Sequence, residues 1–304
     1  MVVQWEAAVA AVATRDNRAP AVYALRVNET LSAALLAFVG YTFLNLGQAG
    51  QKIGLAMKSD RPAPGWTLWV FATLATSVSF WFVFAAISIG TVSLAGAMSG
   101  TGLASLAIFS RIVMNERLGI GKTIALAGVI AGAALVAWFA EPGGTDANLA
   151  ILYGFLGVGA IAYSIGAVLA HGGSLAGVML GGLSGFLGAY SQLFQRLGGA
   201  DLPWSDGPIA VIASMITDPV TAIWIGLSIA SMIVIQFSYR HGQATQIIPV
   251  FTANLIVVPV VGGVLVFAER LSPVQWVGVA AVLAGSVVLG RRRAEALEPS
   301  RATR

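Results

Sequence analysis

The chain has 304 residues, of which 57% are hydrophobic and 10% are charged, and its formal net charge is +4. Soluble domains carry about 25% charged residues, so this composition excludes an ordinary soluble protein and predicts an all-α integral membrane protein. Because cysteine is absent, disulfides and thiolate-bound metals are excluded as well. The basic excess is typical of membrane-protein loops and does not indicate nucleic-acid binding.

The amino-terminal region, residues 1–30, is expected to lie at the surface as a short or interfacial helix followed by a linker. It is too polar to span a bilayer, and no cleavable signal peptide is expected in it. Its charges at the end nearest the first apolar segment are Arg15, Asp16, Arg18, Arg26 and Glu29.

Nine apolar segments follow, each close to the roughly 20 residues that a membrane-spanning helix needs. A short amphipathic helix is expected within 199–218, and a solvated basic tail at 291–304. The predicted spans are 31–52, 67–89, 91–114, 119–139, 149–170, 174–197, 219–240, 243–268 and 274–290.

The charges of the connecting loops predict the orientation. If the spans alternate, one side of the membrane receives 12 of the 17 Lys and Arg residues, and the other side receives 9 of the 13 acids. The positive-inside rule places the first side in the cytoplasm, together with the carboxyl terminus. We therefore expect an integral protein of a plasma membrane, such as the bacterial inner membrane.

Two parts of the chain resemble each other. A shift of 153 residues aligns NERLGIGKTIALAGVIAG (115–132) with AERLSPVQWVGVAAVLAG (268–285), and Phe84 with Phe237. The sequence then predicts two four-helix units, 31–139 and 174–290, joined by a linking helix at 149–170. Because the second unit begins five spans after the first, the two units are predicted to be inverted relative to each other, as in many secondary transporters.

A glutamine motif also recurs, in QAGQKIG (48–54) and QLFQRLG (192–198), at a shift of 144. Glutamines three residues apart share one face of a helix. In one interpretation the cations reach the lipid headgroups while the glutamines bond neighbouring helices. In the other, each motif lines one of two alternating gates. The residues concerned are Gln48, Gln51, Lys52, Gln192, Gln195 and Arg196.

The Glu-Arg-Leu trio that follows the third helix of each unit resembles a motif of the drug/metabolite transporter superfamily, in its EamA-type members. The trios begin at Glu116–Arg117 and Glu269–Arg270, and each acid is expected to pair with a neighbouring basic residue. The chain has one span fewer than the ten-helix pattern of that family. A first unit of four helices that contains the stretch GQAGQKIGLAM is similar to the NIPA-type branch, which is associated with magnesium transport. The resemblance implies a central cavity between the repeats.

Uncharged polar residues near the middle of the spans are the candidate solute ligands. Hydroxyl and amide groups beside aromatic rings suit a neutral or zwitterionic organic solute, although the same groups commonly bond helix to helix. Two prolines in one span predict either a static kink or free carbonyls in the cavity. The candidates are Asn45, Gln48, Trp81, Ser99, Thr101, Tyr190, Gln192, Gln236, Thr252 and Asn254, with Pro249 and Pro259 as the prolines.

Glycines recur at every fourth residue in the span 174–197. Small residues at this spacing allow helix backbones to approach closely, so we expect tight packing along this stripe. The same is expected in the span 119–139. The stripes are Gly173, Gly177, Gly181 and Gly185 in the first case, and Gly128 and Gly132 in the second.

These patterns favour a secondary transporter of small organic metabolites that works by alternating access, without a cofactor or bound metal and with no enzymatic activity. The expected partners are the solute and the lipid bilayer, and a homodimer is left open. A magnesium transporter is the alternative and would need acids at the mouths, such as Glu116, Asp218 or Glu269. A membrane subunit that scaffolds a complex is the third hypothesis.

Overall fold

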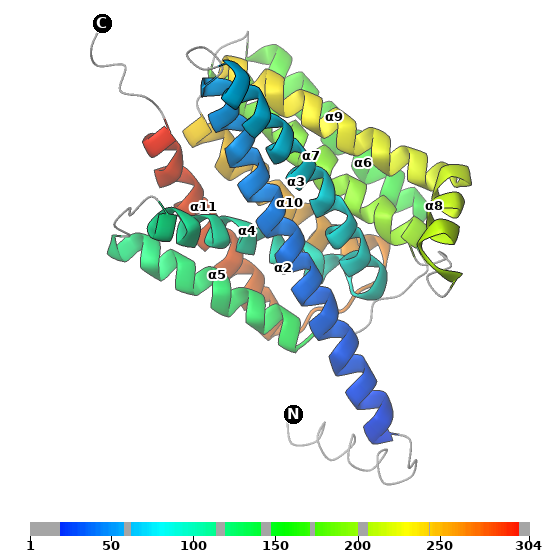
Figure 1. Ribbon diagram of the computed structural model, residues 1–304. Coiled ribbons are helices and arrows are strands. Elements are labelled where there is room, and N and C mark those ends of the chain that lie inside the picture. The colour runs from blue at the N-terminus through cyan, green and yellow to red at the C-terminus, as the bar shows by residue number, and fades with distance from the viewer. Residues whose placement is uncertain are drawn as a thin grey trace, which may run out of the picture.

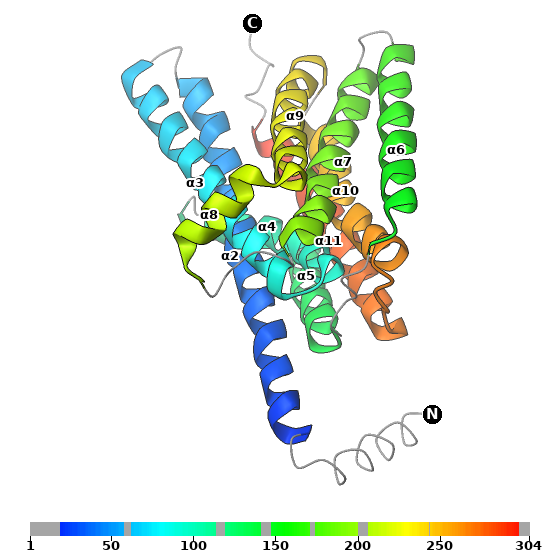
Figure 2. The same cartoon turned by 90° about the vertical axis from the view of Figure 1, so that its right-hand side faces the viewer.

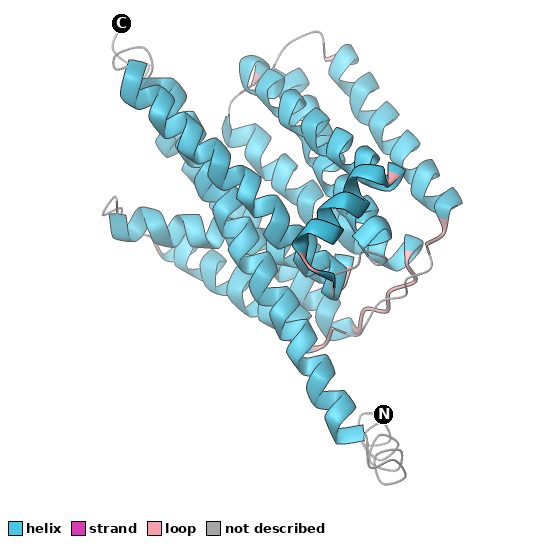
Figure 3. Cartoon of the chain, turned by 45° about the vertical axis from the view of Figure 1, so that its right-hand side comes forward, coloured by secondary structure: helices cyan, strands magenta, loops and turns pink. Residues whose placement is uncertain are grey.

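A computed structural model describes residues 19–57, 62–113, 119–140, 147–170, 174–199, 206–242 and 244–297. Throughout these ranges the regular secondary structure is helical (Figure 3). The helices form one bundle, from which the start of α2 projects (Figure 1). In order they are α2 Ala19–Met57, α3 Pro62–Ile89, α4 Val92–Val113, α5 Ile120–Trp138, α6 Leu149–Leu169, α7 Ser174–Gly199, α8 Pro208–Thr217, α9 Pro219–His241, α10 Ala244–Val266 and α11 Pro273–Leu297.

The prediction of an all-α membrane protein is confirmed. Eight of the nine predicted spans coincide with helices that are long and apolar enough to cross a bilayer, and the ninth, in α11, has a shorter apolar part at Pro273–Leu289. The short helix expected within 199–218 is α8.

Two helix boundaries differ from the predicted ones. The helix expected from residue 31 begins at Ala19, and the last helix continues to Leu297 through the start of the predicted tail. Polarity limits which residues lie in lipid, but a helix satisfies its own backbone hydrogen bonds and so continues beyond the lipid. Alanine, which recurs in both extensions, also favours helix.

Local sequence signals fix the start of two helices. The Asn148 side chain accepts a hydrogen bond from the Ile151 amide at 3.2 Å and caps α6. Asp218 caps α9 by accepting from the amides of Val220 at 3.1 Å and Thr221 at 3.0 Å. Pro219 follows at the first helical position, where its missing N–H costs nothing. Asp218 therefore separates α8 from α9.

The helices of the two predicted units pack in the same order. In the first unit, 31–139, α2 packs on α3 and α4, and α4 packs on α5. In the second, 174–290, α7 packs on α9 and α10, and α10 packs on α11. The units meet where α4 packs on α10 and α5 packs on α11, and α6 lies against α7 (Figure 1).

Helices α5 and α11 run antiparallel and meet through glycine. A Cβ on Gly132 would lie 2.5 Å from the Gly278 carbonyl oxygen, and one on Gly285 would lie 2.6 Å from that of Ala125. The later residue of α5, Gly132, thus contacts the earlier residue of α11, and the earlier Ala125 contacts the later one, as antiparallel helices require. The close packing predicted for Gly132 is thus confirmed, whereas at Gly128 the nearest atom is 3.9 Å away and the close packing predicted there is wrong.

The close packing predicted for the glycine stripe of α7 is confirmed at three of its four positions, where α7 packs on the end of α9 and on α10, and Gly173 lies outside the described residues. A Cβ on Gly177 would lie 2.6 Å from the Gly242 Cα, and one on Gly181 would lie 2.7 Å from the Ile247 Cγ2. Gly185 lies as closely against the backbone of Phe251. Side chains at these positions would push the helices apart.

The central helix of the bundle is α4. All residues from Thr91 to Ala104 are buried, and neighbouring helices pack on several of its faces. Helix α10 runs antiparallel to it: Gly96 contacts Pro259, and Gly100, further along α4, contacts the earlier Ile256. The junction of the two units therefore runs along α4 and α10.

Candidate functional site

A hydrogen bond between two buried side chains joins the first helix of each unit. The Tyr41 hydroxyl on α2 donates to Gln192 Oε1 on α7 at 3.0 Å. Tyr41 is 1% exposed and Gln192 is 4% exposed, so water does not compete for either group. Gln192 is the first glutamine of the second motif, and its carbonyl faces the other unit.

Arg196, the cation of the same motif, binds the end of α3. Its Nη1 donates to the carbonyl oxygens of Ile87 at 3.0 Å and Ser88 at 3.2 Å. The last carbonyls of a helix have no partner within the helix, so a buried guanidinium is a suitable donor for them. At the end of α7, Gly199 lies against Ser88, where a Cβ would be 3.4 Å from the Ser88 Cβ.

Glu269 binds the start of the next helix. Its carboxylate accepts from the amides of Val92 at 3.0 Å and Ser93 at 3.1 Å, in the first turn of α4. A carboxylate is favoured there because it satisfies free N–H groups and interacts favourably with the helix dipole. Glu269 is 6% exposed.

The local backbone brings Glu269 to that position. Ala268 has a φ of 51°, a left-handed conformation that is uncommon for residues other than glycine. The Glu269 amide then donates to the Gly263 carbonyl at 3.0 Å. A side chain on Gly263 would overlap the Glu269 carboxylate and the Ser93 hydroxyl, so this position needs glycine.

Arg196 and Glu269 thus hold the α3–α4 turn from both sides. We call the two side chains, with the backbone groups that they bind at Ile87, Ser88, Val92 and Ser93, the α3–α4 latch. The opposite charges of Arg196 and Glu269 attract each other. Both come from the second unit, whereas the turn belongs to the first.

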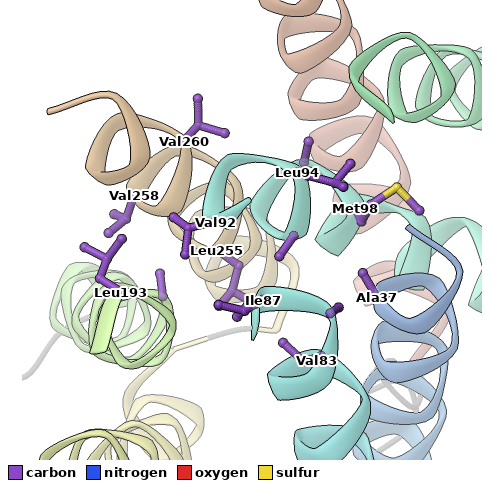
Figure 4. Close-up of a cluster of buried hydrophobic side chains, with 14 of the residues drawn as sticks. Ala37, Val83, Ile87, Val92, Leu94, Met98, Leu193, Leu255, Val258 and Val260 are labelled. Carbon is purple, nitrogen blue, oxygen red and sulfur yellow. The ribbon is translucent and has the colours of Figure 1, made fainter. Parts of the chain in front are cut away.

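The latch adjoins the main hydrophobic core, to which the side chains of Ile87 and Val92 belong. Leu193 and Val258 face each other, and Val92, Leu255 and Ile87 lie next to them (Figure 4). All five are buried members of the main hydrophobic core. The charges therefore act in a region of low dielectric, where hydrogen bonds are electrostatically stronger than in water.

The expected pairing of Glu269 with a neighbouring basic side chain is wrong. Arg270 is exposed, and the carboxylate instead binds backbone amides more than 170 residues away in the sequence. Glu116 and Arg117, the counterparts in the first unit, lie outside the described residues, and so does the side chain of Lys52.

The structure places the predicted mid-span ligands in several environments. Ser99 and Thr101 donate within their own helix, to Gly96 at 2.7 Å and to Met98 at 2.6 Å. Thr252 is buried on α10. Asn254 joins two helices, because it accepts from the Tyr163 hydroxyl of α6 at 3.0 Å.

The remaining candidates do not form one cluster. Gln51 is bonded within its own unit, to Thr73 at 3.2 Å and Thr76 at 3.4 Å. Trp81 is 50% exposed on α3, and Gln236 is exposed on α9. The other positions are Asn45, which donates to the Tyr41 carbonyl at 2.9 Å, Gln48, which is half-buried, and Tyr190, whose hydroxyl donates to the Leu152 carbonyl.

Both predicted prolines lie inside α10, which continues through them. Pro259 is buried against Gly96 of α4, where a Cβ on the glycine would lie 2.7 Å from the proline Cβ. Pro249 is also buried. Pro259 is therefore part of the packing at the junction of the units.

Sequence reasoning missed Tyr41 and Tyr163. A tyrosine in an apolar span usually reads as an aromatic residue at the membrane interface, and its buried hydroxyl partner is not visible in the sequence. Thr42 and Ser105, which share a hydrogen bond of 2.9 Å between α2 and α4, were missed for the same reason. Among the described residues, no group of three or more His, Asp or Glu side chains could hold a metal ion.

No family model matches the sequence, no curated protein matches it at a significant level, and no solved structure does so either.

Proposed function

We propose that this protein is a secondary transporter that moves a small neutral or zwitterionic organic solute by alternating access, with two inverted units of the kind seen in drug/metabolite transporters. The observation that carries the proposal is the reciprocal contact of α5 with α11. Gly132 contacts Gly278, and Gly285 contacts Ala125. At the shift of 153, Gly132 corresponds to Gly285 and Ala125 corresponds to Gly278, so each contact is the counterpart of the other. Such an exchange is what a two-fold axis between the helices would produce.

A second regularity supports the inverted repeat. The buried faces of α3 and α9 correspond at a shift of 152, one residue less than the shift that aligns the later helices. This shift aligns Phe84 with Gln236 in place of Phe237. The exceptions are Phe84, which is buried opposite the exposed Gln236, and Thr221, which is buried opposite the half-buried Trp69. The buried positions that do correspond are Ala72, Thr76, Ser79, Val83 and Ala86 in α3, and Trp224, Ser228, Ser231, Ile235 and Ser238 in α9.

The buried polar groups support an uncharged or zwitterionic solute. In the described residues the buried charged side chains are Arg196 and Glu269, which bind helix ends. The buried polar side chains that bond between the units include the Tyr41 hydroxyl and the Gln192 amide. Hydroxyl and amide groups give directional recognition without a charge that would have to be neutralised.

The loop charges support an orientation with the carboxyl terminus in the cytoplasm of a plasma membrane, such as the bacterial inner membrane. In that orientation the α2–α3 turn faces the cytoplasm and the α3–α4 latch lies at the outer end of the bundle.

A thermal-shift screen of the purified protein against neutral and zwitterionic metabolites tests the proposal, with magnesium chloride as a separate arm. A ligand of the folded state raises the melting temperature by mass action. Each hit is then followed as uptake into proteoliposomes. We expect an organic hit that is transported, whereas magnesium flux without organic transport would overturn the proposal.

Variants refine this test. Gln192→Leu should weaken uptake of the hit, because it removes a buried amide between the units. Gln246→Leu is the matched control, because it removes an exposed glutamine at the start of α10. Equal uptake by the two variants would exclude Gln192 from the transport path.

A further inference from the structure

The two ends of the bundle are not packed alike. At the latch end, α3 of the first unit packs on α7 of the second. The corresponding pair at the other end is α9 with α2, and these two helices do not pack on each other in the part of the chain that the structure describes. Figure 2 shows the end of α2 and the start of α3 well apart from the end of α9.

Side-chain burial follows the same asymmetry. Near the end of α3, Phe84 and Ile87 are buried, and the Phe84 ring lies over Trp224 of α9 with 5.6 Å between the ring centroids. Near the end of α9, Arg240 and His241 are exposed. Two related units that pack closely at one end and stand apart at the other have the arrangement that alternating access requires of a single state.

We propose that the α3–α4 latch is the closed gate at this end of the transport path, and that the path opens there when Arg196 and Glu269 release the turn. The proposal rests on the transporter function proposed above. Any movement of the units that separates α3 from α7 must break the bonds of Arg196 to Ile87 and Ser88. A movement that carries α4 away from the α10–α11 connection must break those of Glu269.

Both charged side chains of the gate bind backbone groups, which explains why the gate lies at a turn between two helices. The turn presents the free carbonyls of one helix and the free amides of the next within a few residues. One cation and one anion from the opposite unit bind two groups of each set. Their release exposes these groups to water at the mouth of the path, where water can satisfy them.

The absence of cysteine from the sequence makes a cross-linking test direct. Ser88→Cys with Gly199→Cys reports the closed latch, because the two Cβ atoms would be 3.4 Å apart, close to disulfide geometry. Leu55→Cys with Arg240→Cys occupies the corresponding positions at the other end and reports the opposite state. Gly188→Cys with Ser231→Cys, at 3.7 Å within the second unit, controls for oxidation.

Each of the three cysteine pairs is oxidised in membranes, once with no other substitution in the chain and once together with Glu269→Gln. Arg270→Gln is the matched control, because it removes the exposed neighbouring charge. Glu269→Gln should slow the closed-latch cross-link and accelerate the opposite one, changing the ratio of their rates roughly tenfold, since charge-assisted hydrogen bonds are lost from one state alone. Arg196→Gln should act in the same direction, and the control pair should not change.

The proposal is overturned if the 55–240 cross-link never forms while the 88–199 cross-link is complete, because the latch would then be a static connection. It is also overturned if Glu269→Gln slows all three pairs equally, which would indicate general loss of structure. Neither measurement needs a solute. A failed metabolite screen would therefore count against the proposed function and leave the result on the gate intact.

Discussion

The Tyr41–Gln192 hydrogen bond allows a quantitative test of how the two units are held together. Tyr41→Phe removes the donor and leaves the Gln192 carbonyl buried, whereas Gln192→Leu removes the acceptor. An unpaired buried group costs about 1–3 kcal/mol in soluble proteins, but hydrogen bonds between membrane helices average about 0.6 and reach about 1.7 kcal/mol. Because Tyr41 is 1% and Gln192 is 4% exposed, we expect each single substitution to cost about 1 kcal/mol, toward the upper part of the membrane range.

The double variant, Tyr41→Phe with Gln192→Leu, should cost much less than the sum, because no polar group is then left unpaired. The free energy of unfolding is measured for all four proteins by denaturant titration in mixed micelles. We expect a coupling energy of about 1 kcal/mol. Tyr41→Phe combined with Gln246→Leu, a distant exposed position, should be additive. Additivity of the Tyr41 and Gln192 substitutions would show that the bond contributes nothing to stability.

Three further predictions concern packing, backbone strain and capping. Gly132→Ala should lower the unfolding free energy by about 1–3 kcal/mol, because its Cβ would lie 2.5 Å from the Gly278 oxygen, while Gly128→Ala should not lower it; equal melting temperatures would contradict the close contact. Ala268→Gly should raise stability by about 0.5–1 kcal/mol, because glycine adopts the left-handed φ of 51° without strain; a lower melting temperature would refute this. Asp218→Ala should cost about 1 kcal/mol through loss of the α9 cap, and Asp218→Asn less, in the same thermal assay; identical losses would show that capping is not the cause.

The positions of the spans were predictable because the bilayer imposes a length and an apolar composition on each helix. The α7 glycine stripe was predictable because glycines at every fourth residue lie on one helix face and allow another backbone to approach closely, as Gly177 and Gly181 do. The start of α2 at Ala19 was not predictable from polarity, which indicates where lipid ends but not where a helix ends.

The candidate site was predictable only in part. Arg196 and Glu269 stand in the recurring sequence motifs, but their partners are backbone groups of the α3–α4 turn, far away in the sequence. Backbone carbonyls and amides are present at every residue, so no pattern of residue types reveals which of them a charged side chain will bind. The same limit explains the misassigned partner of Glu269.

The latch end also contains polar atoms that the closed arrangement does not satisfy. Gln195 Oε1, Arg196 Nε and Trp224 Nε1 are buried and have no hydrogen-bond partner among the described residues. A buried unpaired polar atom costs about 1–3 kcal/mol, which opposes the stabilisation that the bonds of Arg196 and Glu269 provide. Opening to water would remove this cost as the latch bonds are lost. The free-energy difference between the closed and open arrangements is therefore smaller than the latch bonds alone would give. The proposed gate requires such a small difference, because it must populate both arrangements.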